Sequence, residues 1–515
     1  MTRRSTSREA AGATRLPTMI QHQANDQAAR TDATASIVPF AVRAIVLLIF
    51  LVLPLKIVRY GYLPVLDDPV ADAAKAVSGR PWTDILVLKP YFALDPHIGW
   101  HAVLRAIYLA THWSTRALVV FSVIALFVAL SWSAVPWFKR PEAWLATFVL
   151  VIGVVTGFVE RVMIGRPFLV SAAVLVTVLC LWQTYGSLPP NRRMYAALTG
   201  LIALAVLLHG SWYLWALPVA AFSLAGQRQW ARALAASWIA GAILGAVLTG
   251  HPIGYLVESV RMGLEAFGHH AFTRTLVSEF QPTRDSLPGF LLIGGLLVFR
   301  KLGGHATRPL RSNPAFWLAC LGLVLGYQAM RFWSDWGLIA LMVVMAFELE
   351  AFMIDRMPGL ALERLAWSAG LATALYLMST HDADSRWTTS RDTLYLAQDN
   401  PELAGWLPDR GGVLYAADMS LFYQTLFRNP DAPWKYMVGF EPAMMPDEDF
   451  RTYQNIMYNH GNSLAYLPWL RKMRPADRIA LRLLAQPQLA GLEWKSVNGV
   501  WLGRPQGLDS ARRIR

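Results

Sequence analysis

The chain has 515 residues, of which 55% are hydrophobic and only 16% are charged. An average soluble domain carries about 25% charged residues, so the composition excludes a secreted soluble enzyme and favours a polytopic membrane protein. The formal net charge of +13 does not indicate a nucleic-acid partner, because basic loops beside apolar stretches contact anionic lipid heads. Cys180 and Cys320 both lie inside apolar runs, so neither a disulfide framework nor a zinc site is predicted.

Residues 1–34 are polar and lack apolar periodicity, so we expect a disordered tail before a transmembrane domain over 35–380. A spanning helix needs about 20 mostly apolar residues. Eleven stretches are predicted to span: 37–57, 117–138, 143–159, 168–187, 194–209, 211–225, 233–249, 287–300, 314–330, 336–352 and 365–379. Several are short, and on length alone 287–300 fits a re-entrant or interfacial segment as well.

Basic loops set the predicted orientation. The tail and the loops that alternation places with it are rich in arginine and lysine: 139–140, 192–193, 228–232, 300–311 and 355–364. The positive-inside rule makes this face cytoplasmic. Residues 58–116 and the C-terminal segment 381–515 then lie outside the cytoplasm, as expected for an odd number of spans.

The first extracytoplasmic loop, 58–116, carries the adjacent carboxylates Asp67 and Asp68. Neighbouring carboxylates disfavour each other's ionisation, so one is a candidate general base with a raised pKa. The alternative is a helix N-cap, because Asp68 precedes Pro69. The two roles are compatible, since a cap can also aim a carboxylate.

The rest of this loop is predicted to form amphipathic helices that lie at the membrane interface. It contains Lys89 and His101, which are candidate substrate-binding residues. His97 and His101 are spaced to share a helix face, but no third metal ligand is evident nearby, so interfacial histidines are favoured over a metal site.

Further polar residues occur in turns that the topology places on the same face. Glu160, Arg161 and Arg166 lie between two predicted spans, where charges mark either substrate paths or snorkelling helix ends. The other turn residues on this face are His209, His251, Glu279 and Arg331. Each alone is an ordinary turn residue, but their shared face favours one site.

The segment 381–515 has mixed charge, turn sequences and strand-like runs at 412–417 and 492–501, which predict a small α+β domain. Within it, residues 434–442 read Trp-Lys-Tyr-Met-Val-Gly-Phe-Glu-Pro. This segment fits either an acceptor site or a buried strand or loop of the domain.

The polar residues resemble motifs of the GT-C superfamily of polytopic glycosyltransferases. The resemblance is to a bacterial branch of this superfamily, whose members lie in the inner membrane. After the acidic pair, residues 166–171 read Arg-Pro-Phe-Leu-Val-Ser and 207–210 read Leu-Leu-His-Gly. Residues 251–254 read His-Pro-Ile-Gly and 279–282 read Glu-Phe-Gln-Pro. Leu207, His251 and Phe280 stand where the family pattern has Asn, Asn and Trp.

The resemblance implies an all-α GT-C-like fold and a hexosyl or pentosyl transferase. Such an enzyme takes a sugar from a polyprenyl-phosphate-linked donor and passes it to an extracytoplasmic glycan, lipid or protein. Asp67 or Asp68 would be the base, and Glu279 would bind a sugar hydroxyl or orient an arginine. The candidates for binding the donor phosphate are Arg161, Arg166, His209, His251 and Arg331. The sequence identifies no metal ligand set and leaves open whether a divalent metal is needed beside the lipid-linked donor.

Two other functions fit the same features. A transporter of lipid-linked glycans also needs lateral entry and arginines, although it needs no carboxylate outside the bilayer. A non-catalytic subunit of an envelope glycan assembly system would use 381–515 to recruit partners. No P-loop, dinucleotide fingerprint, His-Glu-x-x-His or Gly-x-Ser-x-Gly motif occurs in the sequence.

Overall fold

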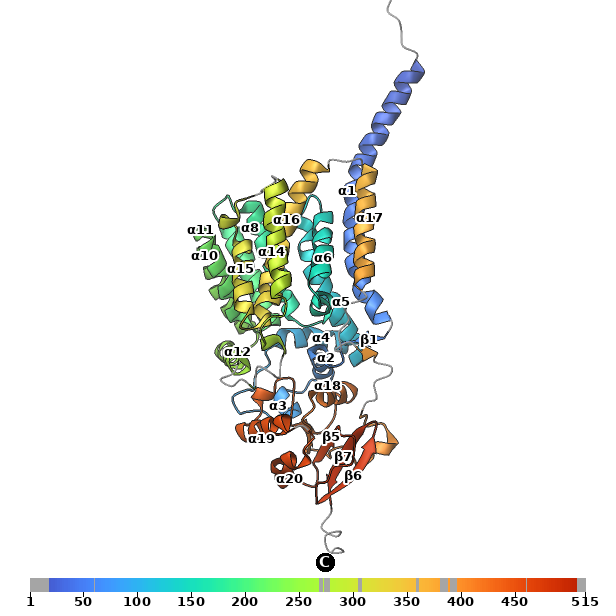
Figure 1. The fold of residues 1–515 in the computed structure, drawn as a ribbon, viewed down its shortest axis with the longest axis vertical. Coiled ribbons are helices and arrows are strands. Elements are labelled where there is room, and N and C mark those ends of the chain that lie inside the picture. The colour runs from blue at the N-terminus through green and yellow to red at the C-terminus, as the bar shows by residue number, and fades with distance from the viewer. Residues whose placement is uncertain are drawn as a thin grey trace, which may run out of the picture.

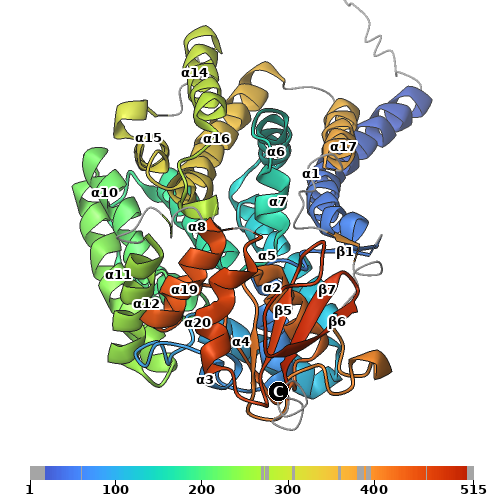
Figure 2. The same cartoon turned by 60° about the horizontal axis from the view of Figure 1, so that its bottom comes forward.

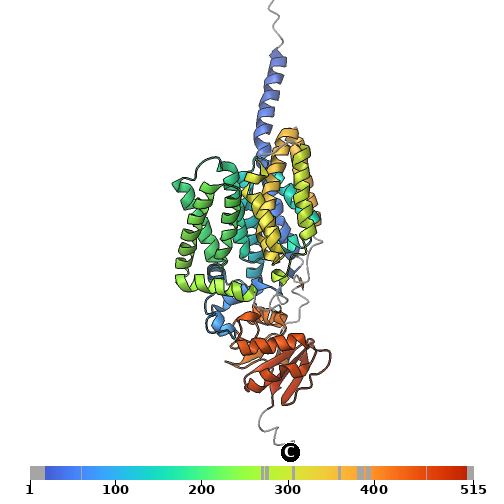
Figure 3. The ribbon, with the colours of Figure 1, turned by 60° about the vertical axis from the view of Figure 1, so that its left-hand side comes forward.

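The computed structural model describes residues 18–59, 61–267, 272, 278–303, 308–357, 361–379, 388–389, 396–459 and 461–506. It has two parts: a bundle of apolar helices and a smaller C-terminal domain at one end of the bundle (Figure 1). Figure 3 shows the same two parts from the side, with the C-terminal domain below the bundle. We refer to these ends as the domain end and the opposite end.

The bundle contains a helix at each of the predicted apolar stretches. The helices are α1 (Thr18–Arg59), α5 (Thr115–Ser133), α6 (Glu142–Val154), α8 (Phe168–Tyr185), α9 (Arg192–Leu208), α10 (Ala216–Leu224), α11 (Arg228–Leu248), α14 (Ser286–Gly303), α15 (Pro314–Gly326), α16 (Leu338–Arg356) and α17 (Ala361–Met378). Among the described residues, six helical segments are long and apolar enough to cross a membrane. The chain is therefore a helical membrane protein, but this count is smaller than the eleven spans predicted.

The first helix differs from the prediction. Residues 18–34, predicted to be disordered, belong to the 42-residue helix α1, whereas 1–17 lie outside the described residues. Alanine, glutamine and arginine have high helix propensity, so a polar segment without an apolar face can still continue a helix. The N-terminal part of α1 extends beyond the bundle (Figure 1).

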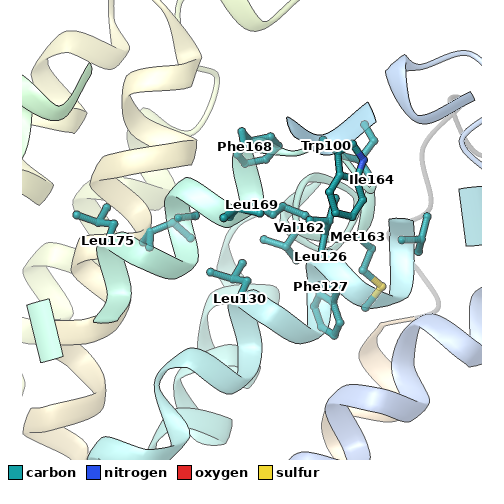
Figure 4. Packing of buried hydrophobic residues seen from close by; sticks show 14 of the residues in the cluster. Trp100, Leu126, Phe127, Leu130, Val162, Met163, Ile164, Phe168, Leu169 and Leu175 are labelled. Carbon is teal, nitrogen blue, oxygen red and sulfur yellow. The ribbon is translucent and has the colours of Figure 1, made fainter. Parts of the chain in front are cut away.

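The bundle core is close-packed around α5, α8 and the short helix α7 (Phe158–Met163). Figure 4 shows Leu126 and Phe127 of α5 near Val162 and Met163 of α7. These four side chains are at most 3% exposed. Burying each large apolar side chain contributes about 1.5–3 kcal/mol relative to water, so this packing fixes the turn that follows α7.

Three helices form within the first loop: α2 (Asp68–Ser78), α3 (Trp82–Ile85) and α4 (Ile98–Thr111). Leu109 of α4 is exposed, which fits the predicted interfacial helix. Most of α2 is buried instead, because it packs against α4, α5 and α18 of the C-terminal domain. The prediction of an interfacial helix is therefore wrong for α2: its apolar face meets protein.

Helix α12 (Pro252–Phe267) lies across the domain end of the bundle (Figure 3).

The C-terminal domain is α+β, as predicted. Its five strands have the order β4-β3-β5-β7-β6, with β5 and β7 antiparallel and β3 parallel to both β4 and β5. Figure 2 shows α19 and α20 beside this sheet. The elements are β3 (Val413–Tyr415), α18 (Met419–Arg428), β4 (Lys435–Tyr436), α19 (Asp447–Tyr458), α20 (Leu467–Lys472), β5 (Arg478–Leu481), β6 (Leu492–Val497) and β7 (Val500–Pro505).

Both strand-like runs are confirmed, with one difference. The run 492–501 is not one strand: β6 and β7 form a hairpin around Asn498 and Gly499. Both residues have positive φ, at 54° and 75°, which a two-residue hairpin turn of the primed type requires.

Backbone contacts join the C-terminal domain to the first loop. The Val87 N–H donates to the Tyr436 carbonyl at 3.0 Å, and the Lys89 N–H donates to the Met444 carbonyl at 2.8 Å. A two-stranded sheet also pairs β1 (Tyr62–Leu63) with β2 (Thr388–Thr389). The first loop is thereby held between the bundle and the domain.

Candidate functional site

The tandem aspartates begin α2. Asp67 is the N-cap, and its carboxylate accepts the backbone N–H of Asp68 at 2.7 Å. Pro69 follows at the start of the helix, where its missing N–H costs nothing. The predicted cap therefore exists, although Asp67 and not Asp68 provides it. The Asp67 residue is only 1% exposed, whereas the Asp68 side chain is 22% exposed.

Arg166 connects both aspartates to the bundle. It follows Gly165, whose φ of +82° and close approach to the Val123 backbone suit only glycine. The Arg166 guanidinium donates hydrogen bonds to Asp67 and Glu279 and lies 3.1 Å from the Asp68 carboxylate. This single side chain therefore contacts three carboxylates: the adjacent Asp67 and Asp68, and Glu279 from a distant part of the chain.

Glu279, in a short 3-10 helix (Ser278–Phe280), is the centre of the cluster. Its buried carboxylate accepts hydrogen bonds from Arg161 at 2.5 Å, from Arg331 at 2.7 Å and from Arg166. Arg161 also forms a bidentate pair with Asp335, at 2.8 and 2.7 Å. Asp335 belongs to a π-helical segment, Phe332–Gly337, which directly follows Arg331. Such π-helical turns often occur at functional sites.

These residues surround a cavity of 410 Å³ between the bundle and the C-terminal domain. Six of the predicted site residues line it: Asp67, Asp68, Arg166, His209, Glu279 and Arg331. Arg161 does not line the cavity, but its guanidinium donates a hydrogen bond to the Glu279 carboxylate. The predicted convergence of acids, arginines and a histidine at one end of the bundle is therefore present in the structure.

The C-terminal domain closes the cavity. Tyr423 of α18 and the loop residues Phe440 and Glu441 line it. The Tyr423 hydroxyl donates a hydrogen bond to the Asp68 carboxylate at 3.0 Å. Within 434–442, Trp434 and Tyr436 are buried in the domain, as one interpretation predicts, whereas Phe440 and Glu441 line the cavity; acceptor binding by this segment stays a prediction.

Burial and neighbouring charges shift the titration of the cavity residues. Burial raises the pKa of Asp68, as do the carboxylates of Asp67 and Asp72, while the Arg166 guanidinium opposes the rise. Burial raises the pKa of Glu441 to about 7, assisted by the Asp68 and Glu279 carboxylates and opposed by Arg331. The cavity therefore contains two carboxyl groups that hold protons more readily than usual.

His209 is the C-cap of α9 and lines the cavity. Its ring nitrogens lie 3.3 Å from the Ser171 hydroxyl and 3.4 Å from the Ser211 hydroxyl. A neutral imidazole can donate one hydrogen bond and accept another, so His209 is suited to polar recognition rather than to charge pairing.

Three predicted site residues lie outside the cavity. His251 is exposed near the start of α12. Lys89 is buried and pairs with Asp447 at 3.0 Å and Glu265 at 3.6 Å, so it joins the first loop to α19 and α12. His101 is buried behind the cavity wall and does not line the cavity. All three belong to segments at the domain end of the bundle (Figure 1), but lying at one end does not bring residues into one pocket.

His101 lies between two aspartates. Its Nδ1 is 2.5 Å from Asp95 and its Nε2 is 2.8 Å from Asp72. Despite burial, the two carboxylates raise the pKa of His101 to about 9. Asp72 also supplies the third group that the sequence did not indicate: ligand atoms of Asp72, His97 and His101 all lie within 4.8 Å of one another. These three residues have the donor types of a metal site.

Tyr423, Glu441 and His97 line the cavity but were not among the predicted site residues. The aromatic-acidic segment at 434–442 was the only sequence signal for Glu441. Tyr423 lies in an amphipathic helix whose pattern is indistinguishable from ordinary core packing. Comparison of the chain with protein-family models gives no match, and neither does comparison with curated proteins.

Proposed function

We propose that this protein is a membrane glycosyltransferase that moves a sugar from a polyprenyl-phosphate-linked donor to an acceptor hydroxyl in the cavity at the domain end. One observation carries the proposal: the partly exposed carboxylate of Asp68 and the partly exposed guanidinium of Arg331 line the same 410 Å³ cavity. A base and a phosphate-binding cation on one cavity are what transfer from a sugar phosphate requires.

The position of the cavity favours a lipid-linked donor. It lies at the end of a bundle of apolar helices, and its lining includes Leu214, Phe280 and Phe332 beside the charged residues. A prenyl chain would enter between helices while its phosphate stays at the polar end. The proposal includes a GT-C-like arrangement with eleven crossings, a cytoplasmic N-terminus and a C-terminal domain outside the cytoplasm in a bacterial inner membrane.

The two aspartates have different roles in this proposal. Asp67 is the helix cap and is almost fully buried against Arg166, so it orients the arginine. Asp68 is more exposed and has a raised pKa, which suits a general base. Asp68 accepts the proton of the acceptor hydroxyl as that oxygen attacks the anomeric carbon. The bond from this carbon to the phosphate oxygen breaks, and polyprenyl phosphate leaves with the bonding electrons.

Arg331 is the cation best placed for the donor phosphate. Its side chain is 33% exposed and lines the cavity, whereas those of Arg161 and Arg166 are 10% and 11% exposed and pair with carboxylates. The Glu279 carboxylate pairs with the Arg331 guanidinium and fixes its orientation before the donor phosphate binds. Fixed cations in a poorly hydrated cavity stabilise a leaving phosphate without reorganisation.

The test is transfer of labelled sugar from polyprenyl-phosphate donors by the purified chain in liposomes. Asp68→Asn should lower turnover by about 10²–10⁴-fold, the range typical of lost general-base catalysis. Normal turnover in both Asp68→Asn and Asp67→Asn, with normal folding, would contradict the proposal. Movement of the intact lipid-linked glycan across the bilayer without transfer would favour a transporter, and neither activity in the wild type would favour an assembly subunit.

A further inference from the structure

Behind the cavity wall, α2 and the region around the start of α4 bring together polar groups that the proposed transfer does not use. Asp72 lies on α2, His97 caps α4, and His101 lies one turn into α4. Asp72 and His101 are at most 5% exposed, and the His97 side chain is 20% exposed. Two imidazoles four residues apart share one face of a helix, and the third group comes from a different helix.

The distances suit a small metal ion. Two metal–ligand bonds of about 2.1 Å at a tetrahedral angle separate the ligand atoms by about 3.4 Å. His101 Nε2 lies 2.8 Å and His97 Nδ1 lies 3.8 Å from Asp72 Oδ1, so the observed separations bracket this value. Shifts of less than 1 Å would seat an ion between the three groups.

Asp95 provides the support that metal-binding histidines usually have. His101 Nδ1 contacts the Asp95 carboxylate at 2.5 Å, and Lys75 lies 3.1 Å from the same oxygen. A carboxylate on one ring nitrogen of a metal-binding histidine fixes the tautomer and aims the other nitrogen at the metal. Here that other nitrogen, Nε2, faces Asp72.

A second and independent observation concerns Asp72 itself. The residue is 3% exposed, and its Oδ2 atom is buried without a hydrogen-bond partner among the residues that the structure describes. Buried carboxylate oxygens are normally satisfied, and a bound ion is one recognised explanation for an exception. An ion held by His97, His101 and both carboxylate oxygens of Asp72 would remove this deficit.

We propose that Asp72, His97 and His101 form a binding site for a divalent transition-metal ion of the Zn²⁺ class. Two imidazoles and one carboxylate are a common ligand set for such ions. The ion takes the place of the proton that His101 Nε2 shares with Asp72. His97 also lines the 410 Å³ cavity, so the ion lies at the cavity wall and ties α2, which begins at Asp68, to α4.

The test is Zn²⁺ binding to the purified full-length chain, which needs no sugar donor or acceptor. The chain is prepared in detergent with a histidine-free tag, stripped with a chelator and titrated by calorimetry. Wild type should bind one Zn²⁺ per chain. His97→Ala should bind at least tenfold more weakly, and Asp95→Asn about 10–100-fold more weakly, as for other outer-shell carboxylates. The His97 side chain is 20% exposed, with the 3.8 Å contact to Asp72 and a ring contact to His209, so its removal should perturb the fold less than removal of the buried His101.

His112→Asn is the matched control. His112 lies at the other end of α4, is exposed and has a φ of 54°, which asparagine tolerates. This variant should bind Zn²⁺ like wild type, and Zn²⁺ should raise the melting temperature of both but not that of His97→Ala. The absence of saturable binding by wild type would overturn the proposal, since His101 would then be only an ion-paired structural residue. Equal binding by wild type, His97→Ala and Asp95→Asn would also overturn it.

Discussion

The two ends of the helical bundle carry similar residues in different arrangements. At the opposite end, Glu142 of α6 pairs with Arg364 of α17 at 2.7 Å, and Arg300 of α14 pairs with Glu348 of α16 at 2.7 Å. Each pair joins two helices, and none of these four side chains is more than 16% exposed. These contacts are therefore interhelical ion pairs that hold neighbouring helices together.

At the domain end, more arginines converge on one carboxylate than at the opposite end, where Glu142 meets Arg364 and, at 3.6 Å, Arg140. Glu279 alone accepts hydrogen bonds from three arginines, and the cluster leaves Arg331 33% and Asp68 22% exposed in a shared cavity. Charge pairing in a membrane protein is therefore not in itself a sign of function. What distinguishes the domain end is that its accessible cation and acid share a cavity with residues of the C-terminal domain, whereas the 340 Å³ cavity at the opposite end is lined by residues of the helical bundle alone.

The largest expected effect concerns stability at the opposite end. Glu142→Ala leaves Arg364 without its bidentate carboxylate partner. Removing one partner of a buried ion pair typically costs about 3–5 kcal/mol, so the melting temperature in detergent should fall clearly. Donor binding at the domain end should not change in the fraction that remains folded. A loss of donor affinity without a loss of stability would break the distinction between the two ends.

The next effect concerns donor affinity at the domain end. Arg331→Ala removes the accessible guanidinium, and hydrogen bonds to charged groups contribute about 1.5–3 kcal/mol. The dissociation constant for a polyprenyl phosphate should therefore rise about 10- to 150-fold, as measured by native mass spectrometry. Arg364→Ala is the control with the same substitution at the opposite end. Equal affinities in the two variants would exclude Arg331 as the phosphate-binding residue.

A smaller effect is expected for the contact between the C-terminal domain and Asp68. Tyr423→Phe removes the hydroxyl that donates to the Asp68 carboxylate at 3.0 Å. Because Arg166 still pairs with this carboxylate, the loss should stay near the roughly 0.5–1.5 kcal/mol of a typical intramolecular hydrogen bond, so turnover should change by about 2- to 12-fold, with little change in the KM for the donor. A tenfold rise in the donor KM at constant turnover would show that Tyr423 acts in binding and not on the base.

The smallest effect is a pH dependence. Glu441 has a pKa of about 7, so it is neutral below this pH and negative above it. Ionisation places a negative charge on the cavity wall with Arg331, so affinity for an anionic donor should fall as the pH rises through about 7. An exposed charge pair contributes about 0.2–1 kcal/mol, which corresponds to less than about fivefold. Glu441→Gln should flatten this step, and an unchanged step would assign it to another group.

Much of the fold is predictable from the sequence, because apolar stretches in a membrane protein must become helices. All of the predicted stretches contain a helix, and β3, β6 and β7 form at the predicted runs, whereas β4 and β5 lie outside them. The number of crossings is less predictable, because short apolar helices such as Glu142–Val154 satisfy composition but not length. The burial of α2 was missed because the partner that covers it, α18, comes from a distant part of the chain.

The site was predictable where topology alone restricts it. Asp67, Arg166, Glu279 and Arg331 meet because turns at one end of a compact bundle have little space to separate. Lys89 was misplaced because a loop residue on the correct face can point into another interface, here toward Asp447. Glu441 depended on how the C-terminal domain docks, which no local pattern encodes.

A structure of the chain with a bound polyprenyl phosphate, determined by electron cryo-microscopy, would test the central claim most directly. The account predicts phosphate density within hydrogen-bond distance of the Arg331 guanidinium, in the 410 Å³ cavity that Asp68 also lines. Phosphate bound at the opposite end beside Arg140 and Arg364, with no density near Arg331, would contradict it.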